Sequence, residues 1–446
     1  MSKIIFKRKI YSKILQWKNE NNGKSALLIE GPRRVGKSTI VEEFVKNEYK
    51  SYIIIDFNKA SQDVKSLFDD LMDLDLLFLY LQTVYHVSLH PRESAIVFDE
   101  VQSCPKARQA IKYLVEDGRY DYIETGSLIS IKKNTESITI PSEEDRIYMN
   151  PMDFEEFMWA TGNTNLFQML GQFWNNKIDL CQIHRSIMRD FRLYMLVGGM
   201  PQAVVAYLES NDFTVVDKTK RRIVNLYKDD FLKIDPSGKT SDLFFSIPGQ
   251  LSTKATRFYT NAVIGQQNDQ KIIDLIHTLS ESRTVNVCYK CNDPNIGMNL
   301  HKDSAEYKLF IADTGLFITM AYWDKNYTDN IIYQKLLSDK LPANLGYIYE
   351  NMVAQILVSL GFELFYYTWI KDDKHHYEID FLISEGFKIS PIEVKSSGYK
   401  THTSLDEFLR KFSSRIYHSY MVSPKEYSKK EGIFYIPPYF LHFALT

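Results

Sequence analysis

The sequence predicts an α/β protein with a mostly parallel sheet near the N-terminus, a helical middle and a second α/β region towards the C-terminus. Between residues 25 and 124, four short apolar runs alternate with stretches of helical spacing, a pattern typical of a parallel sheet covered by helices. A glycine-containing turn at residues 31–38 joins the first apolar run to the next helical stretch. After residue 150 the pattern is mainly helical, and alternating strands return after residue 360.

The expected elements follow in chain order. An amphipathic helix within residues 1–24 carries on one side the apolar residues Ile10, Ile14, Leu15 and Trp17. Strands are expected at 25–29, 52–57, 95–98 and 120–124, and helices at 38–45, 63–84 and 107–115. The middle should hold helices at 153–160, 188–196, 201–210 and 217–232. Two strand-like pieces, 284–289 and 307–311, are compatible with a small winged-helix module. A helix at 345–360 precedes strands at 363–369, 377–384, 389–395 and 417–422.

Length and composition limit the class of protein. At roughly 150 residues per domain, 446 residues suggest two to four domains. We expect a division into residues 1–160, 161–330 and 331–446. Hydrophobic residues make up 44% and charged residues 25%, the balance of a soluble globular protein. The formal net charge of -2 gives no global basic field for nucleic acid. The basic run Lys218, Lys220, Arg221 and Arg222 is interpreted as a solvated helix face.

Cysteine content and the N-terminus favour a cytoplasmic protein without a membrane partner. Four cysteines in this length do not make a disulfide scaffold. Cys288 and Cys291 form a lone CxxC, and no second pair stands nearby to complete a zinc site. The N-terminus interrupts its apolar residues with Lys and Arg, unlike a signal peptide. No apolar stretch approaches the roughly 20 residues that span a bilayer.

The turn at residues 31–38 fits the phosphate-loop pattern GxxxxGK[ST]. Glycine at both ends of the turn allows backbone angles that let successive N–H groups point at phosphate oxygens. Lys37 is expected to hold the β- and γ-phosphates, and the Ser38 hydroxyl is a ligand for Mg²⁺. The predicted nucleotide-binding residues are Gly31, Pro32, Arg33, Arg34, Val35, Gly36, Lys37, Ser38 and Thr39. The sequence therefore predicts binding of ATP with Mg²⁺.

Two acids, Asp99 and Glu100, end the third predicted strand. A buried strand end seldom carries paired carboxylates without a task. We expect Asp99 to hold the Mg²⁺ shell and Glu100 to orient or deprotonate the attacking water. Thr125 or Ser127, after the fourth strand, is the candidate sensor of the γ-phosphate; an ordinary polar turn is the alternative. Arg146 is a candidate charge-neutralising arginine.

A second cluster of charged residues lies on two predicted strands near the C-terminus. Glu393 and Lys395 share one face because side chains alternate along a strand. If the two strands pair as a hairpin around residues 385–386, Asp380 can meet them, and its face also carries Glu378. Two carboxylates with a lysine form the Asp…Glu-x-Lys arrangement of metal-dependent nucleases, in which Glu350 could be a further metal ligand. The alternative is a solvated hairpin with cross-strand salt bridges.

Taken together, these motifs resemble a prokaryotic family of predicted AAA-type ATPases with a C-terminal DUF4143 domain. Further markers lie at residues 97–102, 125–127, 150–157, 198–201, 308–316, 346–351, 378–381 and 392–395. The resemblance implies a P-loop ATPase domain, a helical and winged-helix middle, and a restriction-endonuclease-like C-terminal domain. It places the nucleotide role on Gly36, Lys37, Ser38, Asp99 and Glu100, and the nuclease-like role on Asp380, Glu393 and Lys395. The chain departs from the pattern at Arg34, where relatives often have glutamine, and lacks the glycine that usually precedes the arginine matched to Arg146.

Three functions are consistent with these motifs. In the leading hypothesis, ATP binding and hydrolysis control a metal-dependent nuclease-like module that acts on DNA. In the second, the chain is a nucleotide-controlled switch or scaffold whose C-terminal domain is catalytically inactive and binds a partner. The third, a transport or unfolding motor, requires ring assembly. The expected partners are ATP, DNA and either a protein partner or further copies of the chain. Contacts from the middle region to DNA are expected at Lys254, Arg257 and Lys271.

Overall fold

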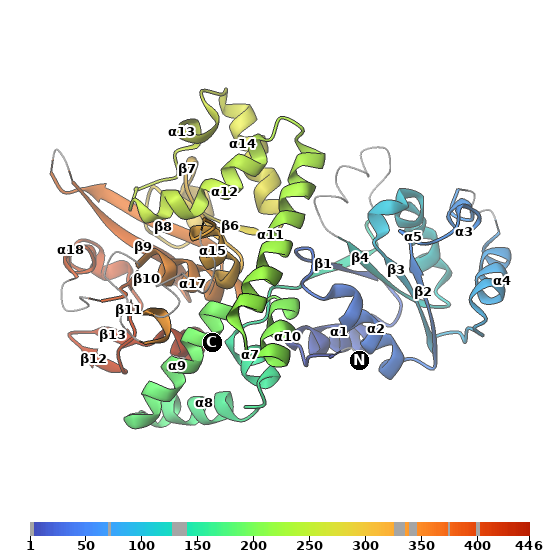
Figure 1. The fold of residues 1–446 in the computed structure, drawn as a ribbon, viewed down its shortest axis with the longest axis horizontal. Helices are drawn as coiled ribbons and strands as arrows, with labels where there is room; N and C mark the ends of the chain where they lie inside the picture. Colours follow the sequence, from blue (N-terminus) through green and yellow to red (C-terminus); the bar gives the residue numbers. More distant parts are fainter. Residues whose placement is uncertain are drawn as a thin grey trace. The chain divides into compact units, whose positions relative to one another are not determined.

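The computed structural model describes residues 4–69, 73–126, 141–324, 335–338, 346–372, 375–397 and 402–446. The chain forms two compact units (Figure 1). The N-terminal unit contains Met1–Asn150 and Glu281–Arg283, and the C-terminal unit contains Pro151–Ser280 and Thr284–Thr446. Among the helices in the described ranges, none combines the length and the apolar content needed to cross a membrane.

The N-terminal unit is built on a parallel sheet of five strands in the order β2-β3-β4-β1-β5. The strands are β1 (Ala26–Glu30), β2 (Ser51–Asp56), β3 (Ser94–Asp99), β4 (Asp121–Gly126) and β5 (Glu144–Tyr148). The helices of this unit are α1 (Lys9–Asn21), α2 (Lys37–Glu48), α3 (Gln62–Ser66), α4 (Leu74–Tyr85) and α5 (Pro105–Asp117). The predicted parallel α/β fold of this region is confirmed.

Both faces of this sheet are covered, which explains why its inner strands are apolar along their whole length. Along β1, Ala26 and Leu28 join one core together with apolar residues of α4 and α5. Leu27 and Ile29 join the other core together with apolar residues of α1 and α2. Polar side chains on these strands are therefore expected mainly at the strand ends, where the chain leaves the two cores.

The edge strand β5 is absent from the elements that the sequence pattern predicts. It pairs with β1 in parallel, from Ala26↔Glu144 to Glu30↔Tyr148. An edge strand has one side open to solvent and does not need a continuous apolar run. Here the run is interrupted by Glu144, Asp145 and Arg146, and this is why hydropathy alone missed the strand.

The C-terminal unit begins with a helical region, as predicted. Its helices are α7 (Phe154–Ala160), α8 (Leu166–Asn176), α9 (Gln182–Val197), α10 (Pro201–Ser210), α11 (Phe213–Ile234), α12 (Lys239–Ser252), α13 (Thr260–Ile264), α14 (Asp269–Glu281), α15 (Thr314–Ala321), α17 (Gly346–Ser359), α18 (Thr403–Phe412) and α19 (Leu441–Leu445). The start of α7 is fixed by a capping box, in which the Asp153 side chain accepts from the Glu156 N–H and the Glu156 side chain accepts from the Asp153 N–H.

The same unit contains a mixed sheet of eight strands in the order β12-β13-β11-β10-β9-β8-β6-β7 (Figure 1). The strands are β6 (Val285–Cys291), β7 (Lys302–Ile311), β8 (Leu364–Ile370), β9 (His376–Glu385), β10 (Lys388–Val394), β11 (Ser419–Val422), β12 (Ser428–Lys430) and β13 (Ile433–Ile436). The strands β6 and β7 form an antiparallel pair, and β6 also pairs in parallel with β8. The two strand-like pieces expected in a winged-helix module thus belong to the C-terminal sheet, which includes residues from both sides of position 330.

Several of the short marker motifs meet at a buried junction in the C-terminal unit. The Asp313 carboxylate accepts hydrogen bonds from the N–H groups of Gly199 and Leu316. A side chain at Gly198 would collide with this carboxylate, and one at Gly199 would collide with the backbone of Met152. These glycines are therefore required for close packing of chain segments, and the motifs that contain them have a structural explanation.

Lys220 contributes a buried charge to the same junction. Its ammonium group donates to the carbonyl oxygens of Leu196, at 2.7 Å, and Gly315, at 3.2 Å. Burial lowers the pKa of Lys220 to about 8. The interpretation of the basic run as a solvated helix face is wrong at this residue, although Lys218 and Arg222 are exposed. The run spans more than one turn of α11, so its members point in different directions.

Replacing Lys220 with methionine is expected to lower the free energy of unfolding by about 1–3 kcal/mol, because two buried carbonyl groups lose their donor. In the wild type, the pKa of Lys220 is about 8 when folded and near 10.5 when unfolded. The unfolded chain therefore binds more protons between these values, so stability should rise from pH 8 to pH 10.5. Urea unfolding at both pH values measures the effect, with Lys218→Met as the control. Equal stability and equal pH slopes in wild type and Lys220→Met would contradict this role.

Candidate functional site

The turn between β1 and α2 has the backbone of a phosphate loop. Gly36 and Arg34 adopt positive φ angles of 105° and 69°, which turn successive N–H groups of the loop inward. Gly31 lies against the backbone of Met149, so a side chain there would collide with the Met149 carbonyl oxygen. The Arg8 side chain supports the loop by donating to the carbonyl oxygen of Val35 at 3.1 Å. The loop therefore has a defined, braced shape.

Lys37 lies at the start of α2 and is folded over the loop. Its ammonium group donates to the carbonyl oxygens of Gly31, at 2.9 Å, and Pro32, at 3.1 Å. Burial lowers the pKa of Lys37 to about 8, although the nearby carboxylates of Glu100 and Asp99 act to raise it. A buried ammonium group whose hydrogen bonds, among the residues that the structure describes, go to backbone carbonyls of its own loop is available to a phosphate placed in the loop, which would compensate its charge.

The predicted magnesium residues meet at the carboxyl ends of neighbouring strands. The Ser38 hydroxyl donates to Asp99 Oδ1 at 2.7 Å. The Thr125 hydroxyl donates to the same carboxylate oxygen. In the strand order, β4 lies between β1 and β3, so the loop, Thr125 and Asp99 come from three adjacent strands. The hydroxyl and carboxylate donors fit a Mg²⁺ ion, which prefers hard oxygen ligands.

Glu100 follows β3 directly and has a positive φ of 55°. This left-handed conformation costs free energy for a residue with a side chain, and such strain is often found at functional sites. The Glu100 N–H donates to the Thr125 hydroxyl at 3.4 Å, and its carboxylate accepts from Gln102. The left-handed conformation of Glu100 ends β3 at Asp99 and changes the direction of the chain there. The alternative candidate sensor, Ser127, lies outside the described residues.

Arg146 is held within the sheet by carboxylates. It lies on β5 beside Leu28, two positions before the end of the strand. Its guanidinium donates to Glu144 at 2.8 Å and lies 3.8 Å from the Glu30 carboxylate. The buried Arg108 also pairs with Glu144 at 3.0 Å. These ion pairs give Arg146 a structural role in a buried cluster beneath the loop, and its proposed role as a charge-neutralising arginine remains a prediction.

The second candidate site lies in the C-terminal unit, where β9 and β10 form an antiparallel hairpin. Asp380 is on β9, Glu393 is on β10, and Lys395 follows β10 directly. Asp380 Oδ2 accepts from the Val394 N–H at 2.7 Å, and the Lys395 ammonium donates to Glu393 Oε1 at 2.6 Å. The hairpin therefore brings Asp380, Glu393 and Lys395 together as the sequence pattern predicts.

The carboxylates of this site repel one another strongly. Burial, together with the Asp380 charge, raises the pKa of Glu393 to about 8 and that of Glu350 on α17 also to about 8. Burial raises the pKa of Glu378 as well. The second oxygen of Glu393 is buried and accepts no hydrogen bond from the described residues. Such an oxygen needs a proton or a cation, since an unpaired buried charge is unfavourable.

Lys308 on β7 is a member of this site that the sequence reasoning did not identify. Its ammonium group is buried and pairs with the Glu378 carboxylate. Burial acts to lower the pKa of Lys308, but the charges of Glu378, Glu350 and Asp380 outweigh it and raise the pKa. Lys308 lies in one of the short marker motifs, but β7 is far from the hairpin in sequence, and only the strand order of the folded sheet relates them.

Metal ligands are not assembled in either unit as described. Across residues 4–69, 73–126, 141–324, 335–338, 346–372, 375–397 and 402–446, no three His, Cys, Asp or Glu side chains are arranged to hold a metal ion. At the hairpin, Lys395 pairs with Glu393, and the Asp380 carboxylate accepts a hydrogen bond from the Val394 N–H. A divalent ion there would have to displace Lys395. In the lone CxxC, Cys288 and Cys291 are both buried.

Comparison with known proteins gives three family models that match separate parts of the chain. An AAA domain matches residues 23–158, a domain of unknown function (DUF8612) matches residues 188–327, and a second domain of unknown function (DUF4143) matches residues 345–439. No curated protein matches the chain. The DUF8612 match covers most of the helical middle and includes β6 and β7.

Solved structures similar to this chain include P-loop ATPases. The Walker-type ATPase of Pyrococcus abyssi is 18% identical, with 71% of this chain and 96% of that chain covered and a TM-score of 0.43. Cdc6p from Pyrobaculum aerophilum is 11% identical, with 76% and 97% covered and a TM-score of 0.23. Drosophila ORC bound to DNA is 13% identical, with 67% and 90% covered and a TM-score of 0.26. From the matched family models, the chain combines an N-terminal AAA-type P-loop ATPase domain with a C-terminal DUF4143 domain.

Proposed function

We propose that the N-terminal unit binds ATP together with Mg²⁺ and hydrolyses it. The observation that carries this proposal is the meeting of Lys37, Ser38, Asp99 and Thr125 at one edge of a parallel sheet, with Ser38 2.7 Å from Asp99. Ligands of open α/β sheets bind at the carboxyl ends of the strands. The phosphates would be bound by N–H groups of the loop and by the positive end of α2.

Each residue then has a separate task in hydrolysis. Lys37 leaves the carbonyl oxygens of Gly31 and Pro32 and binds the β- and γ-phosphates. Ser38 and Asp99 would hold Mg²⁺, which supplies charge neutralisation on the phosphates when bound. Glu100 orients or deprotonates the attacking water. Thr125, whose hydroxyl contacts Asp99 and the Glu100 N–H, is placed to sense the γ-phosphate. The test is phosphate release from ATP by the purified protein with Mg²⁺ and with EDTA, compared with Lys37→Ala.

For the C-terminal unit, we propose a nuclease-like site that acts on DNA and whose state is controlled by the nucleotide. The proposal is supported by the convergence of Asp380, Glu393 and Lys395, and by the buried oxygen of Glu393 that lacks a donor. If all its groups were ionised, this site would carry two more negative than positive charges. The negative charges are the carboxylates of Glu350, Glu378, Asp380 and Glu393, and the positive charges are the ammonium groups of Lys308 and Lys395. A divalent cation would cancel this excess, with Glu350, Asp380 and Glu393 as its ligands.

Titration of Mg²⁺ or Mn²⁺ into the protein by calorimetry tests this cation site. When the loop is filled with ATP analogue and magnesium beforehand, we expect the wild type to show one further class of site, at the hairpin. Glu393→Ala should weaken binding at the hairpin by at least about tenfold, because a charged ligand contributes on the order of 1.5–3 kcal/mol. Glu407→Ala, which removes a carboxylate paired with Arg410 on the surface of α18, should leave the heats unchanged. Equal heats in wild type and Glu393→Ala would refute the cation site.

The alternative function is a nucleotide-controlled switch or scaffold in which the C-terminal domain binds a partner without cleaving it. It is favoured by the ion pair between Lys395 and Glu393, in which Lys395 neutralises the Glu393 charge without a metal. A protein partner or further copies of this chain are the proposed ligands in that case. In this alternative, ATP hydrolysis is slow and Glu393 has no part in binding divalent cations, so the same calorimetric comparison distinguishes the two functions.

A further inference from the structure

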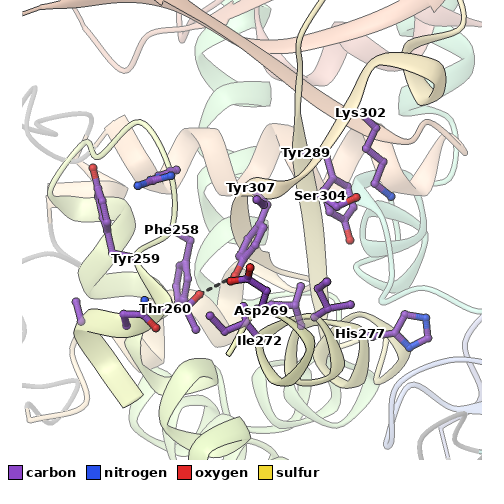
Figure 2. Close-up of a pocket in the computed structure, with 16 residues that line it drawn as sticks. Phe258, Tyr259, Thr260, Asp269, Ile272, His277, Tyr289, Lys302, Ser304 and Tyr307 are labelled. Atoms are coloured by element: carbon purple, nitrogen blue, oxygen red, sulfur yellow. Dashed lines mark hydrogen bonds between the residues drawn. The ribbon is translucent and has the colours of Figure 1, made fainter. Parts of the chain in front are cut away.

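A cavity of about 710 Å³ lies in the C-terminal unit between α13, α14 and the strands β6 and β7 (Figure 2). Pockets that hold small molecules occupy about 300–1,000 Å³. The cavity is separate from the carboxylate site, although β7 contributes to both. Tyr307 lines the cavity, whereas the next residue, Lys308, pairs with Glu378, since neighbouring side chains of a strand point to opposite faces.

Aromatic rings form one wall of this cavity. The rings of Phe258 and Tyr307 lie nearly parallel, with an interplanar angle of 25° and centroids 6.3 Å apart. Tyr289, opposite Tyr307 in the β6–β7 pair, extends this wall edge-on, with an interplanar angle of 70° and its centroid 6.4 Å from that of Tyr307. The Tyr307 hydroxyl is fixed by a hydrogen bond of 2.6 Å with Thr260, which Figure 2 shows as a dashed line.

The opposite wall is aliphatic and is provided by α14. Ile272, Ile273 and Ile276 line the cavity from this helix, and Ile273 is 47% exposed. A helix face that leaves a large aliphatic side chain half in solvent, directly across from a row of rings, forms a slot with two apolar walls. Such a slot favours a flat, apolar-faced group between the walls, because aromatic faces stack well on planar ligands.

Two cationic side chains of the cavity lining, Lys302 and Arg257, lie close to aromatic rings. The ammonium group of Lys302 lies 3.6 Å from the centroid of Tyr289, and the guanidinium of Arg257 lies 5.3 Å from the centroid of Tyr259. Lys302 is exposed and makes no ion pair within the described ranges of the chain. Arg257 shares a single carboxylate, Glu306, with Lys290, so its charge is only partly compensated.

We propose that this cavity binds a nucleotide unit, with its base between the aromatic and aliphatic walls and its phosphate at Lys302 or Arg257. Stacking on aromatic side chains beside a cationic backbone contact is the common mode of binding for unpaired nucleotides. Asp269 and Ser304 supply polar atoms at the cavity for the edge of the base or for the ribose. The unit belongs either to a free nucleotide or to a single strand of nucleic acid, which offer the same chemistry.

The test uses the full-length chain with Lys37→Ala in every protein, so that the phosphate loop does not contribute. Binding of a fluorescein-labelled single-stranded oligonucleotide is followed by fluorescence anisotropy, with unlabelled AMP as the competitor. Ala305→Trp places a large ring in the cavity at an exposed position of β7, and Tyr259→Ala removes a ring that is 46% exposed. Both positions are open enough that folding is not at risk, and thermal unfolding checks this. Matched controls are Lys388→Ala, for a charge, and Tyr417→Ala, for a ring that is 57% exposed.

We expect Ala305→Trp to weaken oligonucleotide binding by about tenfold or more, as loss of base stacking does. Tyr259→Ala and Lys302→Ala should each weaken it several-fold, and Lys302→Ala should also reduce its dependence on salt. The two controls should bind like the parent. Competition by AMP identifies a free nucleotide as the ligand, and binding of the oligonucleotide without such competition identifies a strand. The proposal is overturned if neither probe binds, or if Ala305→Trp binds as tightly as the parent.

Discussion

Lys37→Ala is expected to reduce the rate of ATP hydrolysis by a factor of about 10²–10³, the usual effect of deleting one charge-stabilising donor from a preorganised site. The Lys37 ammonium is buried, and within the described residues its hydrogen bonds go to carbonyl oxygens of its own loop. Its depressed pKa, about 8, reflects burial that a phosphate anion would offset. From both observations we expect the Lys37 side chain to contribute much of the free energy of ATP binding.

The matched control is Lys46→Ala, which removes an exposed lysine from the last turn of the same helix, α2. It removes the same charge and should retain the wild-type rate. Malachite-green detection of phosphate with saturating Mg²⁺ measures both variants, and binding of a fluorescent ATP analogue separates lost affinity from lost turnover. A Lys37→Ala protein that hydrolyses ATP like the wild type would remove the loop from the mechanism, whatever the C-terminal unit does.

Glu100 should differ from Lys37 in this comparison because the two residues act at different stages. Lys37 contacts the loop that is proposed to hold the phosphates, whereas Glu100 follows Asp99 in a strained backbone conformation with φ of 55°. A residue that handles the attacking water affects turnover more than binding. The Glu100 N–H donates to the Thr125 hydroxyl and its carboxylate accepts from Gln102, so its proposed role with the attacking water depends on neighbours in β4 and beyond β3.

Much of the N-terminal site could be predicted from the sequence because its signals are local. The inner strands are covered on both faces, and their apolar runs end where the functional residues begin, as at Phe98 and Asp99. The loop pattern needs only eight consecutive residues, so its spacing is visible without knowledge of the fold. Among the described strands of the N-terminal unit, β5 was missed; it lies at the edge of the sheet and carries charges that form a buried cluster with Arg108.

The C-terminal unit was less predictable because its contacts are distant along the chain. The hairpin that joins Asp380 to Glu393 is local and was predicted correctly. The attachment of β6 and β7 to the same sheet was not, since nothing in a period of two residues shows which strand a given strand will pair with. As a result Lys308 was missed as a partner of Glu378, and Lys220 was misread as solvated although it is buried. Charged residues inside buried networks cannot be distinguished from surface charges by composition alone.

Asp380→Asn is expected to reduce metal-dependent cleavage of DNA by at least about 100-fold. In the wild type, the Val394 N–H donates to Asp380 Oδ2 at 2.7 Å. Asparagine keeps an oxygen that can accept this hydrogen bond, so the hairpin should remain intact. It removes the negative charge that raises the pKa values of both Glu350 and Glu393. A cation held by these groups would lose a charged ligand, and charge stabilisation by a bound metal contributes several kcal/mol to phosphate-ester cleavage.

Cleavage of single- and double-stranded DNA and of RNA, with Mg²⁺ or Mn²⁺ and with or without ATP, measures this effect. Glu407→Ala, outside the site on α18, is the control for loss of a carboxylate. Cleavage by Asp380→Asn at the wild-type rate would exclude Asp380 from the reaction. If the wild type hydrolyses ATP normally but cleaves no substrate, the switch or scaffold is favoured. In that case no metal ion displaces Lys395 from its ion pair with Glu393. A cleavage rate that changes with ATP would instead show that the two units are coupled, because the phosphate loop and the carboxylate cluster belong to different units of the chain.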